Sequence, residues 1–269
     1  YDNAPYGDLV EHLITQAFPP DHPYGHTVIG SMADLDAASL ADAHAFFTSW
    51  YSPSNAVLTL VGDVDPAEAF ARAELYFGHL PRRDVADRTP PGPLPPHAGL
   101  PRVVTSRDVP ESALYVQWRT PARGTPEHDA IDIALTVLGG SETSRLHRQL
   151  VRDQGLSTGA GASTIPLAWG TSLGFAFARV RDGVDLADVE AALVGEVARL
   201  CDEGPTPDEV RRAHVQFERA WLTECAALEA RADLFSAHAT LFGDPGRVNR
   251  RIVDYTSIDA DAVVAAARA

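Results

Sequence analysis

The N-terminal segment holds the side chains whose spacing comes nearest to a metal site. Asp8 and His12 stand four residues apart in a stretch expected to be helical, so both could face one metal ion. Glu11 would then be the base that activates a bound water molecule. The alternative is the polar face of an amphipathic helix. We favour it because zinc prefers nitrogen and sulfur ligands and needs a third protein ligand.

A pair of histidines, His22 and His26, is also four residues apart. Pro23 and Gly25 lie between them and interrupt a helix, so the two imidazoles do not share a helical face. We favour a structured turn in which His22 and Tyr24 form local hydrogen bonds, because a closed metal site needs four ligands. We therefore expect no catalytic residue and no metal ligand within this chain.

The composition describes an acidic, folded chain that is long enough for two ordinary domains. Of 269 residues, 45% are hydrophobic and the net charge is −15, with arginine supplying every cation. An acidic surface disfavours nucleic acid and favours basic peptides. No apolar run approaches the ~20 residues that span a bilayer, so we expect no membrane partner. Cys201 and Cys225 are expected to be buried thiols rather than a disulfide.

The first 80 residues are expected to form three helices and one strand. The first helix ends near Phe18, before two prolines, and Asp36 is the expected N-cap of the second. The apolar run Asn55–Val61 is bounded by proline and glycine, which favours a buried strand. Asp65, followed by proline, caps a third helix that ends at Gly78.

Residues 81–101 contain seven prolines and two glycines, which predicts an extended linker between domains. Beyond it, strands and helices follow one another in an order that favours antiparallel sheets. The expected strands are Val103–Val109, Ala113–Thr120 and 171–181, and the expected helices are Glu127–Leu138, Ser144–Asp153 and those capped by Asp185 and Thr206. The fold class is therefore α+β.

The chain also contains a weak internal sequence repeat. Leu35-Asp36 opens a helix in the first part, and Ile258-Asp259 opens a similar helix near the C-terminus. The first of these helices is followed by the run Asn55–Val61, whereas the chain stops at Ala269 where an equivalent strand is expected. We expect two related units of antiparallel sheet packed with helices, with the first incomplete at its N-terminal side and both ends truncated.

The order of short motifs between residues 22 and 81 resembles one half of the pitrilysin/insulinase-type zinc metallopeptidases. The motifs are His22-Pro23-Tyr24-Gly25-His26, Ile29-Gly30-Ser31, Leu35-Asp36, Tyr51-x-Pro53-x-Asn55, Gly62-Asp63 and Tyr76-Phe77-Gly78-x-Leu80-Pro81. The zinc motif of that family, H-x-x-E-H, occurs nowhere in the chain. The resemblance implies that zinc and its ligands belong to the parent protein and precede Tyr1, and that none is bound here.

A later motif, which reads Leu138-Gly139-Gly140-x-x-x-Ser144-Arg145-Leu146, resembles the start of the family's non-catalytic half. Many members follow it with an arginine and a tyrosine that contact the substrate backbone, but the matching positions here are Val151 and Thr158. Arg145 and Arg152 are then the candidates for binding a peptide carbonyl or carboxylate, with a surface or helix-terminal role as the alternative. Tyr24 is a candidate for a supporting role.

The resemblance implies the arrangement of the domains. Residues 1–80 would be the C-terminal part of a catalytic-type domain, 81–101 a linker, and 102–269 a non-catalytic-type domain without its last strand. The parent would be a zinc-dependent metalloendopeptidase that holds an extended peptide, added to a sheet edge, in a chamber between two homologous halves.

Two alternatives of other classes stay open. Some members of the family lack the zinc motif and complete the chamber of an active subunit, so the parent could be a non-catalytic partner that binds peptide. The chain could also be an unrelated α+β binding module. Under every one of these readings we expect a bacterial, cytoplasmic protein, and we expect that the 269-residue chain alone cleaves no peptide. An unpaired sheet edge could promote pairing with a homologous subunit or a homodimer.

Overall fold

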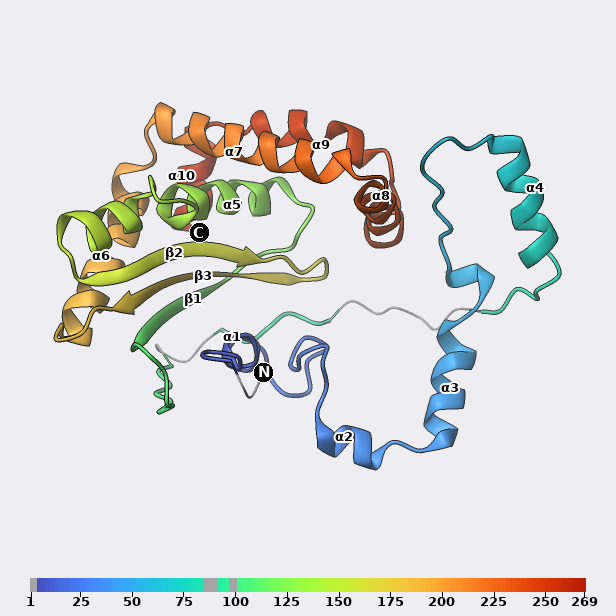
Figure 1. The fold of residues 1–269 in the computed structure, drawn as a ribbon, viewed down its shortest axis with the longest axis horizontal. Helices are drawn as coiled ribbons and strands as arrows, with labels where there is room; N and C mark the ends of the chain where they lie inside the picture. Colours follow the sequence, from blue (N-terminus) through green and yellow to red (C-terminus); the bar gives the residue numbers. More distant parts are fainter. Residues whose placement is uncertain (1–3, 85–90, 97–100) are drawn as a thin grey trace. The chain divides into compact units, whose positions relative to one another are not determined.

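The computed structural model describes residues 4–84, 91–96 and 101–269 (Figure 1). The chain divides into two compact units, each assembled from segments that are distant in sequence. The larger unit contains Tyr1–Val28, Pro90–Gln216 and Asp254–Ala269, and the smaller contains Ile29–Thr89 and Phe217–Val253. The predicted division at a linker over residues 81–101 stays a prediction, because residues 85–90 and 97–100 lie outside the described parts.

The larger unit is built on a three-stranded antiparallel sheet. Its strands are β1 (Ala113–Pro121), β2 (Ser157–Ile165) and β3 (Thr171–Val180), in the order β1-β3-β2. The central strand β3 carries the fully buried Ala176 and Ala178. Because the strand order is β1-β3-β2, β1 and β2 are the edge strands of this sheet. The pairing confirms the predicted α+β class with an antiparallel sheet.

Helices cover both faces of this sheet, as Figure 1 shows with α5 on one side and α1 on the other. On the first side lie α5 (Pro126–Gly139), α10 (Ala260–Arg268) and α6 (Leu186–Glu203), followed along the chain by α7 (Pro207–Ala226). On the opposite side α1 (Leu9–Ala17) packs Ile14 and Phe18 against Leu173 of β3. Apolar side chains from these helices and from the sheet are buried against one another and form the core of this unit.

The smaller unit consists of helices without a sheet among its described residues. It contains α2 (Met32–Ala37), α3 (Leu40–Trp50), the 3-10 turn η1 (Pro53–Asn55), α4 (Pro66–Phe77) and α8 (Leu228–Phe242). The helix α9 (Arg247–Thr256) runs from this unit into the larger one, as α7 runs in the reverse direction. None of the residues of α2, α3 or α4 is buried.

Most of the predicted caps are confirmed. The side chain of Asp65 accepts a hydrogen bond from the backbone of Glu68, and Asp185 accepts one from Ala187. The predicted cap at Asp36 is wrong, because that residue lies inside α2 and Ser39 caps the next helix. Ser39 and Asp42 form a reciprocal capping box, which satisfies two backbone donors at once.

Two predicted strands, Asn55–Val61 and Val103–Val109, are not formed. A strand needs a neighbour that satisfies its backbone groups, and neither segment has one among the described residues. The strand β2 was not expected, because Gly159 and Gly161 lower its intrinsic strand propensity. Part of the helix expected over Ser144–Asp153 forms as the π-helix η2 (His147–Asp153). Cys201 and Cys225 are free thiols and only partly buried.

Candidate functional site

The Gly139-Gly140 pair brings the end of α5 into direct contact with the edge strand β2. A Cβ atom added at Gly139 would lie 2.0 Å from the backbone nitrogen of Ala162, and one added at Gly161 would lie 2.7 Å from the ring of Phe177. No side chain fits at either position. The glycines therefore allow helix and strand to pack backbone against backbone.

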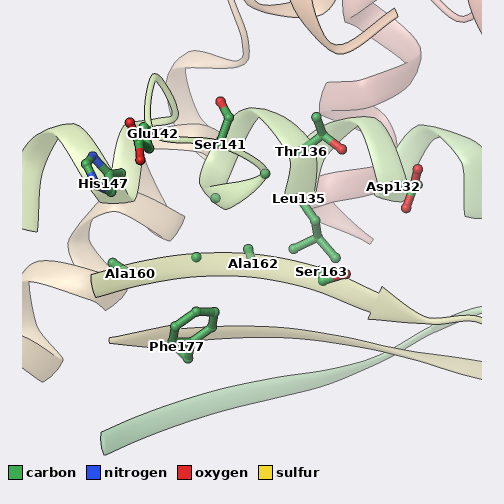
Figure 2. Close-up of a pocket in the computed structure, with 13 residues that line it drawn as sticks. Asp132, Leu135, Thr136, Ser141, Glu142, His147, Ala160, Ala162, Ser163 and Phe177 are labelled. Atoms are coloured by element: carbon green, nitrogen blue, oxygen red, sulfur yellow. The ribbon is translucent and has the colours of Figure 1, made fainter. Parts of the chain in front are cut away.

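A pocket of about 420 Å³ opens beside this contact, between the end of α5, the turn that follows it and β2 (Figure 2). Figure 2 shows His147 and Glu142 at one end of the pocket and Asp132 and Ser163 at the other. The polar residues that line it are Asp132, Thr136, Ser141, Glu142, His147 and Ser163, over a floor that includes Ala160, Ala162 and Phe177.

The polar groups of this pocket favour a hydrogen-bonding or cationic ligand. The carboxylate of Asp132 accepts hydrogen bonds from Thr164 Oγ1 at 3.1 Å and from Tyr255 Oη at 2.8 Å, which holds it in place. Glu142 is exposed, and the buried Nδ1 of His147 has no partner among the described residues. In the same parts of the chain, no three His, Cys, Asp or Glu side chains are grouped to hold a metal ion.

The strand β2 offers a second means of recognition next to the pocket. It pairs with β3 on one side, and no strand of the described chain pairs with its other side. Residues 160–163 of β2 also line the pocket. An extended peptide can add to such an edge through backbone hydrogen bonds, with neighbouring pockets receiving its side chains.

Arg145, a predicted peptide contact, lies in the interior, only 5% exposed. Its Nε and Nη2 donate to the two carboxylate oxygens of Glu209 at 2.9 and 2.7 Å, and Nη2 also donates to the carbonyl oxygen of Gly204 at 2.8 Å. This bidentate pair fastens the loop after α5 to the connection between α6 and α7. A direct contact between Arg145 and peptide stays a prediction.

Glu209 remains ionised in this pair. Burial raises the pKa of its carboxyl group, but the hydrogen bonds from Arg145 and Thr206 outweigh burial and lower the pKa to about 2. Thr206 donates to Glu209 from both its backbone nitrogen (2.8 Å) and its hydroxyl group (3.1 Å). In return the Thr206 hydroxyl accepts a hydrogen bond from the backbone of Glu209, which confirms the predicted cap at Thr206 and completes a capping box.

The other two predicted peptide contacts lie elsewhere in the larger unit, and no hydrogen bond or ion pair among the described residues joins them to Arg145. Arg152 is exposed in the last turn of η2. Tyr24 is half-buried, and its hydroxyl group accepts a hydrogen bond from the backbone of Trp169 at 3.1 Å. The backbone of Tyr24 donates to Nδ1 of His22 at 3.0 Å, which confirms the predicted local turn.

The Asp8 and His12 side chains do meet, as their spacing predicts, with Nε2 of His12 3.2 Å from the Asp8 carboxylate. Arg107 also donates to that carboxylate at 2.8 Å. This hydrogen bond holds the pKa of Asp8 below its usual value. Glu11 is exposed beside them. The group is the polar face of α1, neutralised by an arginine from a distant segment.

Comparison with known proteins places this geometry in a family. Residues 37–216 match the family model described as the peptidase M16 inactive domain. The chain belongs to this family. The predicted resemblance to zinc metallopeptidases is thereby confirmed, and within the described residues the pocket, β2 and the Arg145–Glu209 pair all lie inside the matched range.

Curated relatives carry zinc-protease names. One from Mycobacterium bovis, described as an uncharacterised zinc protease, is 31% identical over 160 residues, which are 58% of this chain and 36% of the relative. The zinc protease PqqE of Helicobacter pylori is 29% identical over 172 residues, or 62% of this chain and 38% of the relative. The chain thus spans less than two fifths of the length of these relatives.

Among solved structures, a protease from Helicobacter pylori has the same fold, with a TM-score of 0.85 and 22% identity over 99% of this chain and 64% of that one. Within the described residues, no helix is both long enough and apolar enough to cross a bilayer.

Sequence reasoning did not find the pocket, although all of its parts were visible. Neither His147 nor Asp132 was singled out in the sequence. The available signal was Gly139-Gly140 at the end of an apolar helix, because paired glycines there allow close packing against a strand. The contact of Asp132 with Tyr255, 123 residues away in sequence, carries no local signal.

Proposed function

We propose that this chain is part of a zinc-dependent metalloendopeptidase, that it supplies the non-catalytic-type domain and the C-terminal part of the catalytic-type domain, and that it helps to hold an extended peptide. The supporting observation is the match of residues 37–216 to a family model described as inactive. In this proposal the zinc ion and its ligands belong to a homologous catalytic half. The peptide lies in a chamber between the halves. Residues 1–80 belong to the catalytic-type domain and 102–269 to the other.

The edge of β2 and the adjoining pocket are the proposed peptide site. An extended peptide forms backbone hydrogen bonds with β2 and places one side chain in the pocket between Asp132 and Glu142. The pocket carboxylates and the net charge of −15 favour peptides with lysine or arginine at that position.

The three residues predicted to contact peptide take different roles in this proposal. Arg152 is exposed, so its guanidinium group is available for a peptide carbonyl or carboxylate. Arg145 acts from the interior by holding the loop that lines the pocket. Tyr24 fixes the segment around Trp169 through its hydroxyl group.

The test measures hydrolysis of matched basic and acidic internally quenched peptides by the complete enzyme, with zinc present and after chelation. We expect cleavage that requires zinc and is faster for the basic peptide, and no cleavage by the 269-residue chain alone. Glu142→Gln should reduce the preference for the basic peptide several-fold. Glu224→Gln removes the same charge at an exposed position outside the pocket and is the control. Equal preference in both variants would contradict the proposed site.

A non-catalytic partner subunit that binds peptide and completes the chamber of a separate, active subunit is the second candidate. It is favoured by the loss of the arginine and tyrosine that resembled proteins carry, since Val151 and Thr158 stand there. Thr158 is engaged with Glu111, to which its hydroxyl group donates at 2.6 Å. Peptide binding that persists without any zinc-dependent cleavage by the complete protein would support this candidate. The cytoplasmic location stays a prediction.

A further inference from the structure

The sheet face that is turned away from α5 carries side chains that the proposed peptide site does not use. Leu173 of β3 packs on α1, and Phe177 and Arg179 share its face because alternate residues of a strand point the same way. Figure 2 shows Phe177 on the side of β2 away from α5. The partners of Phe177 and Arg179 in β2 are Gly161 and Gly159. On this face β2 therefore places no side chain between them and its free edge.

Arg179 carries a positive charge that no carboxylate of the described residues neutralises. Its guanidinium carbon lies 5.6 Å from the centre of the Tyr6 ring. Its side chain passes beside Gly159, where an added Cβ atom would lie 4.0 Å from Cδ of Arg179. A cation–π contact positions a guanidinium group and leaves its N–H donors free. In a chain with a net charge of −15, an exposed arginine with free donors is suited to a carboxylate ligand.

The aromatic partner of Arg179 is itself held in place. The hydroxyl group of Tyr6 donates a hydrogen bond to the carbonyl oxygen of Glu111 at 2.6 Å. The backbone of Tyr6 has a φ of 60°, a left-handed conformation that no other non-glycine residue of the described chain adopts. Such a conformation persists only where the surrounding contacts hold it. Tyr115 of β1, stacked on Phe177 with ring centres 5.8 Å apart, extends the aromatic surface beside Arg179.

The edge strand β2 is irregular at the same place. Its pairing with β3 shifts register between Ser157 and Gly159, which leaves Thr158 as the extra residue of a β-bulge. The hydroxyl group of Thr158 donates to the carboxylate of Glu111 at 2.6 Å, so this carboxylate is bound to the bulge and is not ion-paired with Arg179. A bulge ends regular strand pairing, so Arg179 stands at one end of the part of β2 to which a peptide can add.

An extended peptide on the free edge of β2 turns alternate side chains to opposite faces of the sheet. In the proposed function one side chain enters the pocket between Asp132 and Glu142, on the α5 side. Side chains an odd number of positions away then lie on the face of Arg179. We infer that Arg179 determines specificity by binding the carboxylate of an aspartate or glutamate an odd number of positions from the basic residue of the peptide. This inference rests on the proposed function, which supplies the peptide on β2.

This recognition differs from general attraction between charges. The acidic chain repels an acidic side chain of the peptide, and the pocket carboxylates add to the repulsion on their own face. Only a position that reaches the free guanidinium group gains a charge-assisted hydrogen bond. The spacing between the basic and the acidic residue, and not the net charge of the peptide, then decides affinity. A free C-terminal carboxylate at the same position presents the same group and is tested separately.

The experiment measures binding of fluorescent peptides to the complete enzyme after zinc has been removed, so that no peptide is cleaved. Each peptide has blocked ends, one lysine, and glutamate or glutamine at one to four positions from the lysine on either side. We expect glutamate at an odd position to bind about tenfold more tightly than glutamine, and glutamate at the even positions to bind no more tightly. A peptide that ends at the preferred odd position is compared as the free acid and as the amide.

Three variants assign the effect to one side chain. Arg179→Gln should reduce the tenfold gain to less than twofold and leave the affinity for the glutamine peptides within threefold. Arg179→Lys should keep part of the gain, because it keeps the charge but loses the bidentate donors. Arg219→Gln removes the same charge at an exposed position of α7 and, as the matched control, should keep the whole gain. Because both arginines are exposed, circular dichroism should show each variant folded.

An equal gain at odd and even positions, a gain that survives Arg179→Gln, or no measurable binding of any peptide would overturn the inference. A gain confined to the free acid would assign the anion to the end of the peptide and overturn the side-chain assignment. Zinc is then restored and cleavage of the same peptides is measured. Binding that follows the odd positions without zinc-dependent cleavage would support the role of Arg179 and contradict the proposed peptidase function. Zinc-dependent cleavage without a preference for odd positions would do the reverse.

Discussion

The helices α10 and α3 both begin with a side-chain cap, Asp259 and Ser39, yet α10 has a buried face and α3 is exposed to solvent. Val263 of α10 stands four residues after its cap, Asp259, and is fully buried. Ala43 of α3 stands four residues after its cap, Ser39, and is exposed, as are Phe46 and Phe47 beside it. The local sequence determines where each helix begins, because capping depends on a few neighbouring residues. Burial is determined by what lies across from the helix, and in the larger unit this is α5 and α6.

The largest expected effect comes from introducing a charge at equivalent positions of the two helices. Val263→Asp buries an unpaired carboxylate, so it should lower the free energy of unfolding by about 4 kcal/mol or more. Ala43→Asp should change it by less than about 0.5 kcal/mol, since the side chain is exposed. Urea unfolding followed by circular dichroism measures both. A large loss with Ala43→Asp would show that α3 is already covered in the chain alone.

The interior ion pair should be the next most sensitive feature. Arg145→Met leaves the carboxylate of Glu209 buried without its partner, which should cost about 3–5 kcal/mol of stability. Arg152→Met, at an exposed position, should cost less than about 0.5 kcal/mol and is the control. Comparable losses in the same urea experiment would indicate that Arg152 also has a structural partner.

The same pair should make stability depend on pH in the acid range. The pKa of Glu209 is lowered to about 2 from a usual 4.5, so its contribution is complete above about pH 4.5 and is lost as the pH falls toward 2. A shift of this size corresponds to about 3 kcal/mol. Thermal unfolding between pH 2 and 6 should show a steep decline in the natural chain and a shallower one in Glu209→Gln. Parallel profiles would mean that the carboxylate is not bound by Arg145.

Two glycines should respond in opposite directions to alanine. Gly139→Ala places a Cβ atom against the β2 backbone, and overpacking of this kind costs about 1–3 kcal/mol. Gly195→Ala lies within α6 with no atom inside 4 Å of the added carbon, so it should stabilise the fold by about 0.5–1 kcal/mol. Thermal unfolding midpoints of the two variants provide the measurement. A stable Gly139→Ala protein would show that α5 and β2 are not in backbone contact.

Sequence reasoning was most successful where the information is local. The caps at Asp65, Asp185 and Thr206 depend on residues within one turn of the chain, and all three are formed. The strands β1 and β3 were predicted from the regular alternation of their side chains.

The errors have a common physical cause, because each depended on a distant partner. The run Asn55–Val61 has the composition of a buried strand, but no neighbouring strand pairs with it among the described residues. The burial of Arg145 was not foreseen either, because nothing local shows that Glu209, 64 residues later, binds it; a contact between Arg145 and peptide stays a prediction. The pocket beside β2 likewise requires three segments to meet.

We propose that the zinc chemistry belongs to a part of the enzyme outside this chain and that this chain contributes a surface that holds peptide. The most direct test is metal content, measured as zinc per chain after purification of the 269-residue protein without chelator. We expect near-zero zinc here and one zinc ion per molecule in the part of the enzyme that carries H-x-x-E-H. Stoichiometric zinc in this chain, lost on Asp8→Ala or His12→Ala, would contradict it and assign a metal site to α1.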